Sequence, residues 1–174
     1  MIRKIVFTGP ESTGKTTLTE KLSGVLNLPY VQEMSRPYIH NLQTNYTYDD
    51  LCSIAMLQMS EEEKIMSMNP HFLICDTDLL TIKIWCEDKF KQCDLWLTHA
   101  FVDRTPEMYF LCAPDFPWEE DPQREDSQRR DHLYEVYKEH LIQYKKRFIE
   151  LNGSVENRMH TVLQYLGVQH GNMF

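Results

Sequence analysis

The segment at residues 9–16, Gly-Pro-Glu-Ser-Thr-Gly-Lys-Thr, constrains the fold of this chain more than any other. It matches the phosphate-binding loop pattern G-x-x-x-x-G-K-S/T at every fixed position. The residues before it, Ile5-Val6-Phe7, form a short apolar run of the kind found in buried parallel strands. After it, apolar residues recur at helical spacing, namely Leu18, Leu22, Val25 and Leu26. The motif therefore has the strand–loop–helix context that a phosphate-binding loop requires.

The chemistry of the loop follows from its residue types. Gly9 and Gly14 allow backbone turns that a Cβ would hinder, so successive N–H groups can point into one cavity. The positive end of the following helix adds to the attraction for phosphate oxygens. Lys15 can reach the β- and γ-phosphates, and the Thr16 hydroxyl can ligate Mg²⁺. We therefore predict binding of ATP or GTP with Mg²⁺ by Gly9, Glu11, Ser12, Thr13, Gly14, Lys15, Thr16 and Thr17.

Length and composition indicate one globular α/β domain spanning residues 1–174. With 42% hydrophobic and 25% charged residues, the chain can build a core, and it has no apolar run of membrane-spanning length. Because the N-terminus leads straight into the first strand, we expect no signal peptide or preceding domain. The net charge of −8 argues against a long nucleic-acid footprint, and the five cysteines favour reduced thiols. We expect a cytoplasmic protein that binds neither nucleic acid nor membrane.

Four further apolar runs predict the other strands of a central parallel sheet of about five strands, flanked by helices. These runs are residues 28–31, 72–75, 108–112 and 147–151. Thr47 and Asp50 form a capping-box pattern at the start of a long helix that ends before Pro70. Further helices are predicted at residues 79–89 and 155–166, and residues 169–174 are predicted to be a frayed tail. An amphipathic stripe predicts one more long helix, with Leu133, Val136, Tyr137, Leu141, Tyr144 and Phe148 on one face.

Charged residues follow two of the predicted strands, at the positions where ligands bind in open α/β sheets. Glu33-Met34-Ser35-Arg36 comes after the second strand, although the same residues are equally typical of a solvated helix start. Asp76 follows four apolar residues, as the second metal-site element of such proteins does, and would act on Mg²⁺. Asp78 would point to the same face as Asp76 if the strand continued, or would instead be the N-cap of the next helix.

Residues 117–131 are rich in charge and turn residues and cannot form a core of their own. Because they lie between a strand and a helix, they can form a mobile lid whose arginines, Arg124, Arg129 and Arg130, close over phosphates. The alternative is an ordinary polar loop, which composition alone favours slightly. Asn152-Gly153-Ser154 is a turn signal after the fifth strand, near where an adenine could rest.

Several motifs together resemble those of one family. They are Gly-Pro-Glu-Ser-Thr-Gly-Lys-Thr-Thr-Leu, the Glu33/Arg36 element, Ile-Cys-Asp-Thr-Asp-Leu-Leu-Thr with its following Lys-Ile-Trp, and Pro-Trp-x-x-Asp before the arginines. The series covers nearly the whole chain and resembles the kinase domain of the bifunctional NadR proteins and their stand-alone relatives, which phosphorylates ribosylnicotinamide (nicotinamide riboside). The resemblance implies a P-loop NTPase fold like that of nucleoside and nucleotide kinases. It also strengthens the prediction that Arg124 and Arg129 are lid arginines.

The resemblance implies that ATP donates its γ-phosphoryl group to the 5′-hydroxyl of a nucleoside, with nicotinamide riboside as the first choice. Lys15, Mg²⁺ and the lid arginines would neutralise phosphate charge. Glu33 would be the general base, with Asp78 as the second candidate. Arg36 would contact the acceptor. The candidates to stack on the acceptor's base are Tyr38, Trp85 and Trp118.

Other functional classes stay open at this point. NadR proteins also carry an adenylyltransferase domain, which these 174 residues do not include, so a separate adenylyltransferase could act on the product. The chain could also form a homo-oligomer. The alternative class is a nucleotide-gated regulatory module, which would need only the phosphate loop and Asp76. A polynucleotide end kinase fits less well, because the chain is acidic.

Replacement of Lys15 tests the assignment of the loop. Lys15→Ala is expected to abolish ATP turnover and to leave the fold intact, because this side chain should point into a cavity rather than into the core. The measurement is ATP consumption at equal folded fraction, with circular dichroism as the control for folding. Equal activity of the variant and the parent would overturn the assignment of residues 9–16 as a phosphate-binding loop.

Overall fold

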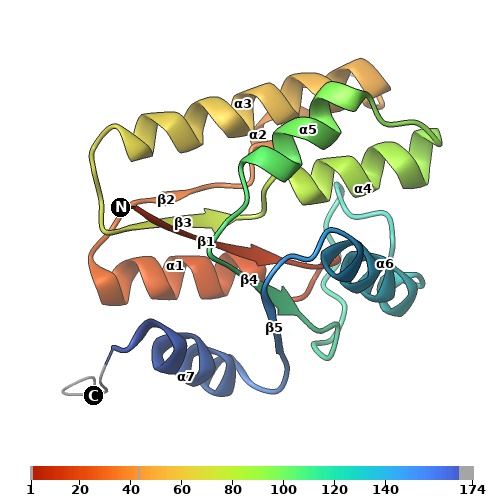
Figure 1. Ribbon diagram of the computed structural model, residues 1–174. Helices are drawn as coiled ribbons and strands as arrows, with labels where there is room; N and C mark the ends of the chain where they lie inside the picture. The colour runs from red at the N-terminus through yellow and green to blue at the C-terminus, as the bar shows by residue number, and fades with distance from the viewer. Residues whose placement is uncertain (1, 43, 169–174) are drawn as a thin grey trace.

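A parallel five-stranded sheet forms the centre of the computed structural model, which describes residues 2–42 and 44–168. The strands lie in the order β2-β3-β1-β4-β5 (Figure 1). They are β1 (Arg3–Thr8), β2 (Tyr30–Val31), β3 (Phe72–Asp76), β4 (Met108–Cys112) and β5 (Phe148–Leu151). Every neighbouring pair is parallel. The prediction of a P-loop fold built on a parallel sheet of about five strands is confirmed.

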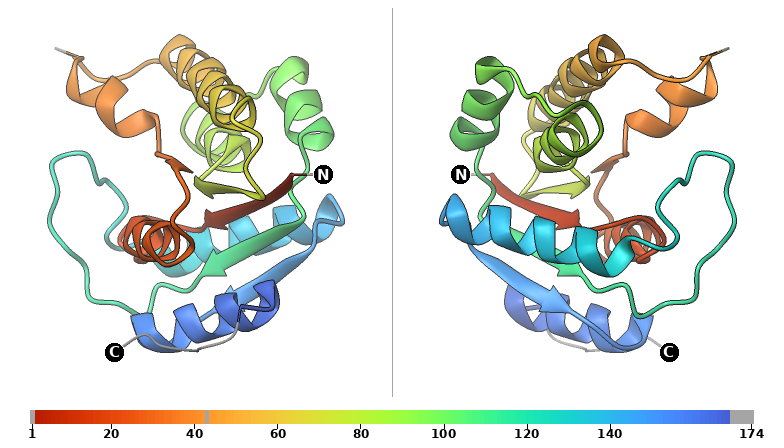
Figure 2. Two further views of the ribbon diagram at one scale, coloured as in Figure 1. Left: turned by 90° about the vertical axis from the view of Figure 1, so that its left-hand side faces the viewer. Right: turned by 90° about the vertical axis from the view of Figure 1, so that its right-hand side faces the viewer.

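Helices cover both faces of the sheet (Figure 2). On one face lie α1 (Lys15–Leu26) and α7 (Val155–Leu166); on the other lie α3 (Tyr48–Met66), α4 (Leu79–Phe90), α5 (Leu95–Asp103) and α6 (Arg130–Gln143). Along β1, Val6 is buried in the core under α3 and α4, whereas Ile5 and Phe7 are buried in the core under α1 and α7. Because both faces are covered, the strands appear in the sequence as continuous apolar runs.

The carboxyl ends of the strands bring the polar segments of the chain to one edge of the sheet. The phosphate loop follows β1, Glu33 follows β2, Asp76 ends β3, and the lid follows β4. The register of β1 and β3 pairs Phe7 with Asp76, and Thr77 N donates to the Phe7 carbonyl at 3.0 Å. Asp76 therefore lies beside the start of the loop, at the edge where open α/β sheets bind ligands.

Most local predictions about helices agree with the structure. Thr47 and Asp50 form both bonds of the capping box at the start of α3, and α7 has the predicted bounds. The residues after β2 form α2 (Ser35–His40), the helix start given as the alternative for that segment. The predicted tail at residues 169–174 lies outside the described residues. Within residues 2–42 and 44–168, no helix has both the length and the apolar character needed to cross a bilayer.

Two helix predictions differ from the structure. The helix α5 is not predicted from the sequence, because its buried residues Leu97 and Phe101 give only a single helical repeat. The amphipathic stripe extends too far, because α6 ends at Gln143 and Phe148 lies in β5. Lys145, with a φ of 52°, turns the chain, yet Tyr144 and Phe148 still pack against the same core cluster as α6. An apolar stripe thus continues across a turn and imitates a longer helix.

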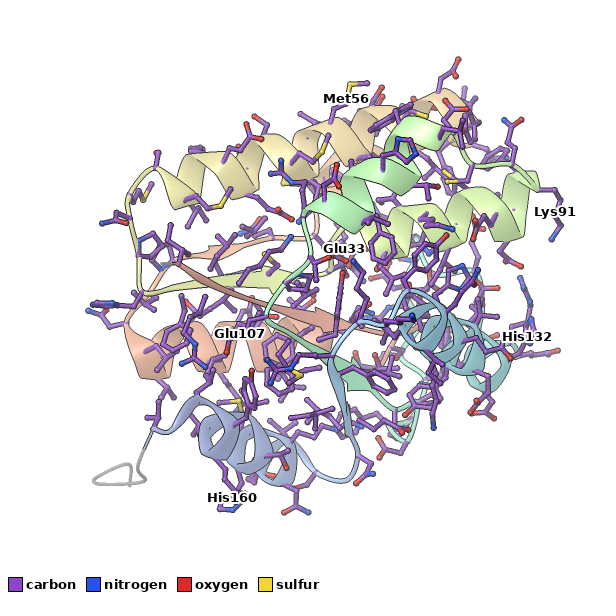
Figure 3. The ribbon with its side chains drawn as sticks, viewed as in Figure 1. Glu33, Met56, Lys91, Glu107, His132 and His160 are labelled. Atoms are coloured by element: carbon purple, nitrogen blue, oxygen red, sulfur yellow. The ribbon has the colours of Figure 1, made fainter. Side chains whose placement is uncertain are left out.

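A carboxylate just before β4 joins β1 to α7. Glu107 accepts hydrogen bonds from Arg3 at 2.8 Å and 2.6 Å and from the Tyr165 hydroxyl at 2.9 Å (Figure 3). The hydrogen bonds from Arg3 lower the pKa of Glu107 from 4.5 to about 2. Because this lowered pKa belongs to the folded state, ionised Glu107 stabilises the fold above pH 4.5, and the contribution is lost as the pH falls toward 2.

We expect Glu107→Gln to lower the free energy of unfolding by about 1 kcal/mol near neutral pH, the usual upper worth of a partly exposed ion pair. The difference between parent and variant should shrink as the pH falls from about 5 to about 3, because protonation removes the parent's advantage. Urea unfolding across this range measures the difference. Glu61→Gln, which affects an exposed pair with Lys64 on α3, is the control. A difference that does not change with pH would contradict the ion-pair interpretation.

Candidate active site

The phosphate loop connects β1 to α1 and depends on glycine at two positions. Gly9 has a φ of 130°, and a Cβ there would lie 2.8 Å from the Cys112 carbonyl oxygen on β4. Gly14 has a φ of 77°, and a Cβ there would lie 2.9 Å from the ring of Phe116. Both distances are too short for a side chain, and both φ values favour glycine. The loop backbone is therefore packed tightly against β4 and against the residues that lead into the lid.

The loop and the start of α1 offer main-chain N–H groups to an anion. The N-cap of α1 is Gly14, which makes no side-chain capping bond, and the first turn has no acidic residue. N–H groups at such a helix start attract phosphate. Lys15 Nζ donates to the Pro10 carbonyl at 2.7 Å, and Thr13 Oγ1 donates to the same carbonyl at 2.9 Å. The lysine ammonium is therefore held over the loop, close to where nucleotide phosphates would bind.

Thr16 and Asp76 place two oxygen ligands beside the loop. Thr16 Oγ1 donates to Asp76 Oδ2 at 2.6 Å, whereas Asp76 Oδ1 is buried without a hydrogen-bond partner among the described residues. Burial, and then the negative charge of Glu33, raise the pKa of Asp76 to about 6. This donor set fits Mg²⁺, which prefers oxygen ligands and takes only one or two carboxylates from a protein.

The remaining metal ligands would have to come from the nucleotide and from water. Residues 2–42 and 44–168 contain no cluster of three or more His, Cys, Asp or Glu that could hold a metal ion by itself. Sites that bind Mg²⁺ together with phosphates usually lack such a cage. Thr16 and Asp76 are therefore suited to a metal ion that arrives bound to phosphates.

One cavity of about 220 Å³ joins the loop to the residues after β2. Its wall on the loop side contains every residue from Gly9 to Thr17. Its wall on the α2 and α4 side contains Glu33, Ser35, Arg36, Ile39, Thr81 and Trp85. The connection from β4 to α6 contributes Phe116, Pro117, Glu119, Gln123, Arg124 and Asp126, and Leu133, Tyr137 and Val155 complete the wall. The structure thus brings the predicted loop residues, Glu33, Arg36, Trp85 and Arg124 to one cavity.

Glu33, labelled in Figure 3, is a carboxylate on the wall of this cavity, which the phosphate loop also lines. One oxygen accepts a hydrogen bond from the Ser35 hydroxyl at 2.6 Å, and the other lies 3.9 Å from Arg36 Nε. Its charge also acts on the pKa of Asp76, so the two carboxylates are close. An ionised carboxylate can accept several hydrogen bonds, so Glu33 keeps capacity for a ligand hydroxyl.

Asp78 does not belong to the cavity wall. Its Oδ1 accepts from Leu80 N at 3.0 Å as the N-cap of α4, and its Oδ2 accepts from the Tyr109 hydroxyl at 2.7 Å. Lys4 Nζ lies 3.9 Å from the same oxygen. Asp78 therefore has the structural role that the sequence analysis gave as its alternative, because both of its oxygens are engaged inside the core.

The three aromatic candidates for base stacking are placed differently. Trp85 lies on the cavity wall and stacks on Tyr46 at 6.2 Å between ring centroids. Tyr38 is outside the wall and donates its hydroxyl to Asp50 at 2.9 Å. Trp118 is also outside the wall, with the guanidinium groups of Arg124 and Arg130 at 6.0 Å and 5.8 Å from its ring. Only Trp85 is positioned to contact a ligand in the cavity.

Arg124 is the lid arginine that lies on the cavity wall. Its Nη1 donates to the Glu119 carbonyl at 2.6 Å and to the Ser12 hydroxyl at 3.3 Å. Its Nε is buried without a hydrogen-bond partner among the described residues. The same guanidinium is also close to two lid carboxylates, with Nε 3.9 Å from Asp121 Oδ2 and Nη1 3.6 Å from Glu119 Oε2. Arg124 therefore lies beside the phosphate loop in long ion pairs that a phosphate could replace.

Arg129 and Arg130 brace the lid from outside the cavity wall. Arg129 donates to Asp88 at 2.7 Å and to Asp126 at 3.0 Å, which fastens the lid to the end of α4. Arg130, the first residue of α6, donates to the Ser12 carbonyl at 2.9 Å and to two carbonyls at the start of the lid. The structure thus separates Arg124 from the other two predicted arginines, whose contacts are with the protein.

The turn after β5 lies at the edge of the cavity. Gly153 N donates to Asp115 Oδ2 at 2.6 Å, and Ser154 caps α7 by accepting from Asn157 N at 3.3 Å. The next residue, Val155, is on the cavity wall, whereas Gly153 and Ser154 are not. Contact of these two residues with a nucleotide base stays a prediction.

Sequence reasoning missed Arg158, which is fully buried in α7 and donates to the Thr13 carbonyl of the loop at 2.8 Å. The sequence did contain an indication that Arg158 is buried, because it precedes Met159 and lies on the same helical face as Val162. Both of those residues are buried. Thr81 and Tyr137 on the cavity wall were also missed, since their apolar surroundings in the sequence indicate only core positions.

The Thr16–Asp76 pair generates a prediction about metal dependence. Asp76→Asn should raise the Mg²⁺ concentration needed for half-maximal binding of a non-hydrolysable ATP analogue by about tenfold or more, because it weakens a metal ligand and keeps the shape of the site. Titration with Mg²⁺ at fixed analogue concentration measures this, with Asp49→Asn, at an exposed position on α3, as the control. An unchanged Mg²⁺ requirement would remove Asp76 from the metal site.

Comparisons with known proteins agree with this geometry. The family profile AAA_28, described as an AAA domain, matches residues 4–158. A NadR protein solved in complex with NR superposes with a TM-score of 0.84 at 20% identity, and another NadR structure, with NAD and AMP-PNP, has a TM-score of 0.76 at 17% identity. These alignments cover 99% of this chain but 54% and 52% of the NadR chains, so this chain spans about half their length.

A thymidylate kinase from Ehrlichia chaffeensis has a TM-score of 0.66 at 17% identity, covering 94% of this chain and 98% of that one. A deoxyadenosine kinase from M. mycoides has a TM-score of 0.60 at 14% identity, with the same two coverages. No curated protein matches the sequence. The fold is therefore the one shared by NadR and the nucleoside and nucleotide kinases, and, with a profile match over most of its length, the chain belongs to the AAA domain family of P-loop proteins.

Proposed function

We propose that this protein is an ATP- and Mg²⁺-dependent kinase that phosphorylates the 5′-hydroxyl of a nucleoside, nicotinamide riboside. The observation that carries the proposal is that Glu33 and the phosphate loop line the same cavity. A kinase needs a carboxylate next to the phosphates, because the attacking hydroxyl must be oriented and deprotonated. A regulatory switch needs only the loop and Asp76, so it gives no reason for Glu33 and Trp85 to line the cavity.

The nucleotide half of the site would be formed by the loop. The N–H groups of the loop and of the first turn of α1 would bind the β- and γ-phosphates. Lys15 would exchange its bond to the Pro10 carbonyl for bonds to phosphate oxygens. Thr16 and Asp76 would hold Mg²⁺, which neutralises charge that develops on the phosphates.

The transfer step would use Glu33 and Arg124. Glu33 would accept the proton of the 5′-hydroxyl while the 5′-oxygen forms a bond to the γ-phosphorus. At the same time, the bond from the γ-phosphorus to the β,γ-bridging oxygen would break, and ADP would leave. Arg124 would donate to the transferring group, exchanging its long ion pairs with Asp121 and Glu119 for bonds to phosphate oxygens. The negative charge of Glu33 near the phosphates is compatible with this role only when cations surround it, and Arg36 and Lys15 lie on the same cavity wall.

The acceptor side of the cavity suits a nucleoside with a positively charged base. Trp85 offers an indole face, and a cation on such a face is attracted by the ring electrons. Glu33 and Glu119 add negative charge to the wall. Thr81 Oγ1 is buried on the wall with no hydrogen-bond partner among the described residues, so it can bind a polar group of the acceptor. The pyridinium ring of nicotinamide riboside fits these features, and one NadR structure with the same fold was solved with NR.

The proposed setting is a reducing cytoplasm, in which a separate adenylyltransferase would act on the product. All five cysteines are free thiols, as that compartment favours. We also propose that residues 1–174 act as a single domain.

The test is a screen of free nucleosides with product formation followed by mass. The acceptors are nicotinamide riboside, thymidine and deoxyadenosine, with water hydrolysis as the control. We expect phosphorylation of nicotinamide riboside at the 5′ position. If ATP is consumed at the same slow rate with or without any nucleoside, the kinase proposal fails and a regulatory module takes its place.

Glu33→Gln tests the proposed base. The variant keeps the shape of the side chain and removes its basicity, so phosphoryl transfer should fall by roughly two to four orders of magnitude while the ATP analogue binds as before. Glu61→Gln on α3 is the matched control and should behave as the parent. Full activity of Glu33→Gln would exclude Glu33 as the base.

A further inference from the structure

Glu11 is a carboxylate inside a loop that is built to bind anions. Like charges repel, so a glutamate at this position opposes phosphate binding and calls for another role. Glu11 is only partly exposed, and the structure shows no ion pair for it with any residue in 2–42 or 44–168. Its role must therefore lie in the hydrogen bonds that it accepts.

Those hydrogen bonds come from the main chain of the lid. Glu11 Oε2 accepts from Glu125 N at 2.9 Å and from Asp126 N at 3.2 Å. A turn ends immediately before these amides, where Arg124 N donates to the Asp121 carbonyl at 3.0 Å. The lid has no helix or strand between β4 and α6 to hold these amides. Glu11 supplies the acceptor that regular structure does not.

Ser12 provides a second attachment for the same segment. Its hydroxyl accepts from Glu119 N at 3.0 Å and from Arg124 Nη1 at 3.3 Å. Residues 119–126 are thus fastened to the phosphate loop near both ends, and Arg124 lies between the two attachments. Figure 2 shows the connection from β4 to α6 as an arc that extends away from the sheet. Other ion pairs, Arg36–Asp121, Lys89–Glu125 and Arg129–Asp88, attach the lid to α2 and α4 and not to the loop. The position of Arg124 relative to the loop therefore depends on Glu11 and Ser12.

We infer that Glu11 is a positioning residue that anchors the lid main chain to the phosphate loop and so holds Arg124 against the transferring phosphate. The inference rests on the proposed kinase function. Glu11 acts through its acceptor oxygen and not through its charge. A glutamine can accept the same two hydrogen bonds, whereas an alanine accepts none.

The inference predicts a specific separation of kinetic effects. An arginine that closes over the phosphates acts mainly on the transition state, so a loosened lid should lower kcat. Loss of the Glu11 charge removes repulsion from the nucleotide, so binding of an ATP analogue should be unchanged or tighter. Removal of a residue that binds ATP directly would instead weaken the binding of the analogue.

The experiment compares Glu11→Ala, Glu11→Gln and Glu120→Ala. Glu120 is an exposed lid glutamate for which the structure shows no hydrogen bond or ion pair with the described residues, so it is the matched control. We expect Glu11→Ala to lower kcat about 10- to 100-fold without weakening the binding of AMP-PNP. The kcat of Glu11→Gln should stay within about threefold of that of the parent. Hydrogen exchange of a peptide covering residues 119–129 should accelerate in Glu11→Ala alone.

The inference is overturned if Glu11→Ala turns over as the parent does, if Glu11→Gln is damaged as severely as Glu11→Ala, or if AMP-PNP binding falls in parallel with kcat. Should the alanine variant fail to fold, Glu11→Asp takes its place, because the shorter side chain withdraws the acceptor and should show the same pattern. The exchange measurement needs no activity. If no nucleoside is phosphorylated, the proposed function fails, and exchange alone still decides whether Glu11 anchors the lid.

Discussion

A buried guanidinium holds the phosphate loop in place. Arg158 donates to the carbonyls of Thr13, Gly153 and Ala113 at 2.8 Å, 3.1 Å and 3.0 Å, and pairs with Asp115. A buried charge destabilises a fold unless it is paired and hydrogen-bonded, and here four acceptors surround it. The three carbonyls belong to the loop, to the turn after β5 and to the end of β4. One side chain therefore fixes the loop against the elements behind it and fixes the point at which the lid begins.

On the other face of the sheet, a second set of buried charges orients α4. Lys4 donates to both oxygens of Glu62 at 2.9 Å and 2.8 Å and lies 3.9 Å from Asp78. Tyr109 donates to Asp78, which in turn caps α4. Because α4 contributes Thr81 and Trp85 to the cavity, the direction of this helix decides the shape of the wall opposite the phosphate loop. That wall therefore depends on polar contacts deep inside the core.

Some of these features can be predicted from the sequence, and others depend on contacts between distant segments. The loop, the strands and α7 carry local signals, because the motif and the apolar runs are complete within a few neighbouring residues. Neighbouring residues in the sequence do not decide which of Asp76 and Asp78 can act at the site. That depends on the hydroxyl of Tyr109 on β4, which donates to Asp78. The same holds for Arg124 and Arg129, of which only the first is on the cavity wall. Residues of identical type a few positions apart are separated by contacts from distant segments, which no spacing rule contains.

Charge balance in the cavity sets a condition on any polyanionic ligand. Glu11 and Glu33 lie on the same wall as Lys15 and Arg124, and burial together with the charge of Glu33 raises the pKa of nearby Asp76. A nucleotide alone would add negative charge to a site in which carboxylates repel one another. A nucleotide that enters with its divalent cation brings positive charge, which favours ionisation of Asp76 and offsets the repulsion between the carboxylates. The carboxylates around this cavity therefore favour the metal complex of the nucleotide over the free nucleotide.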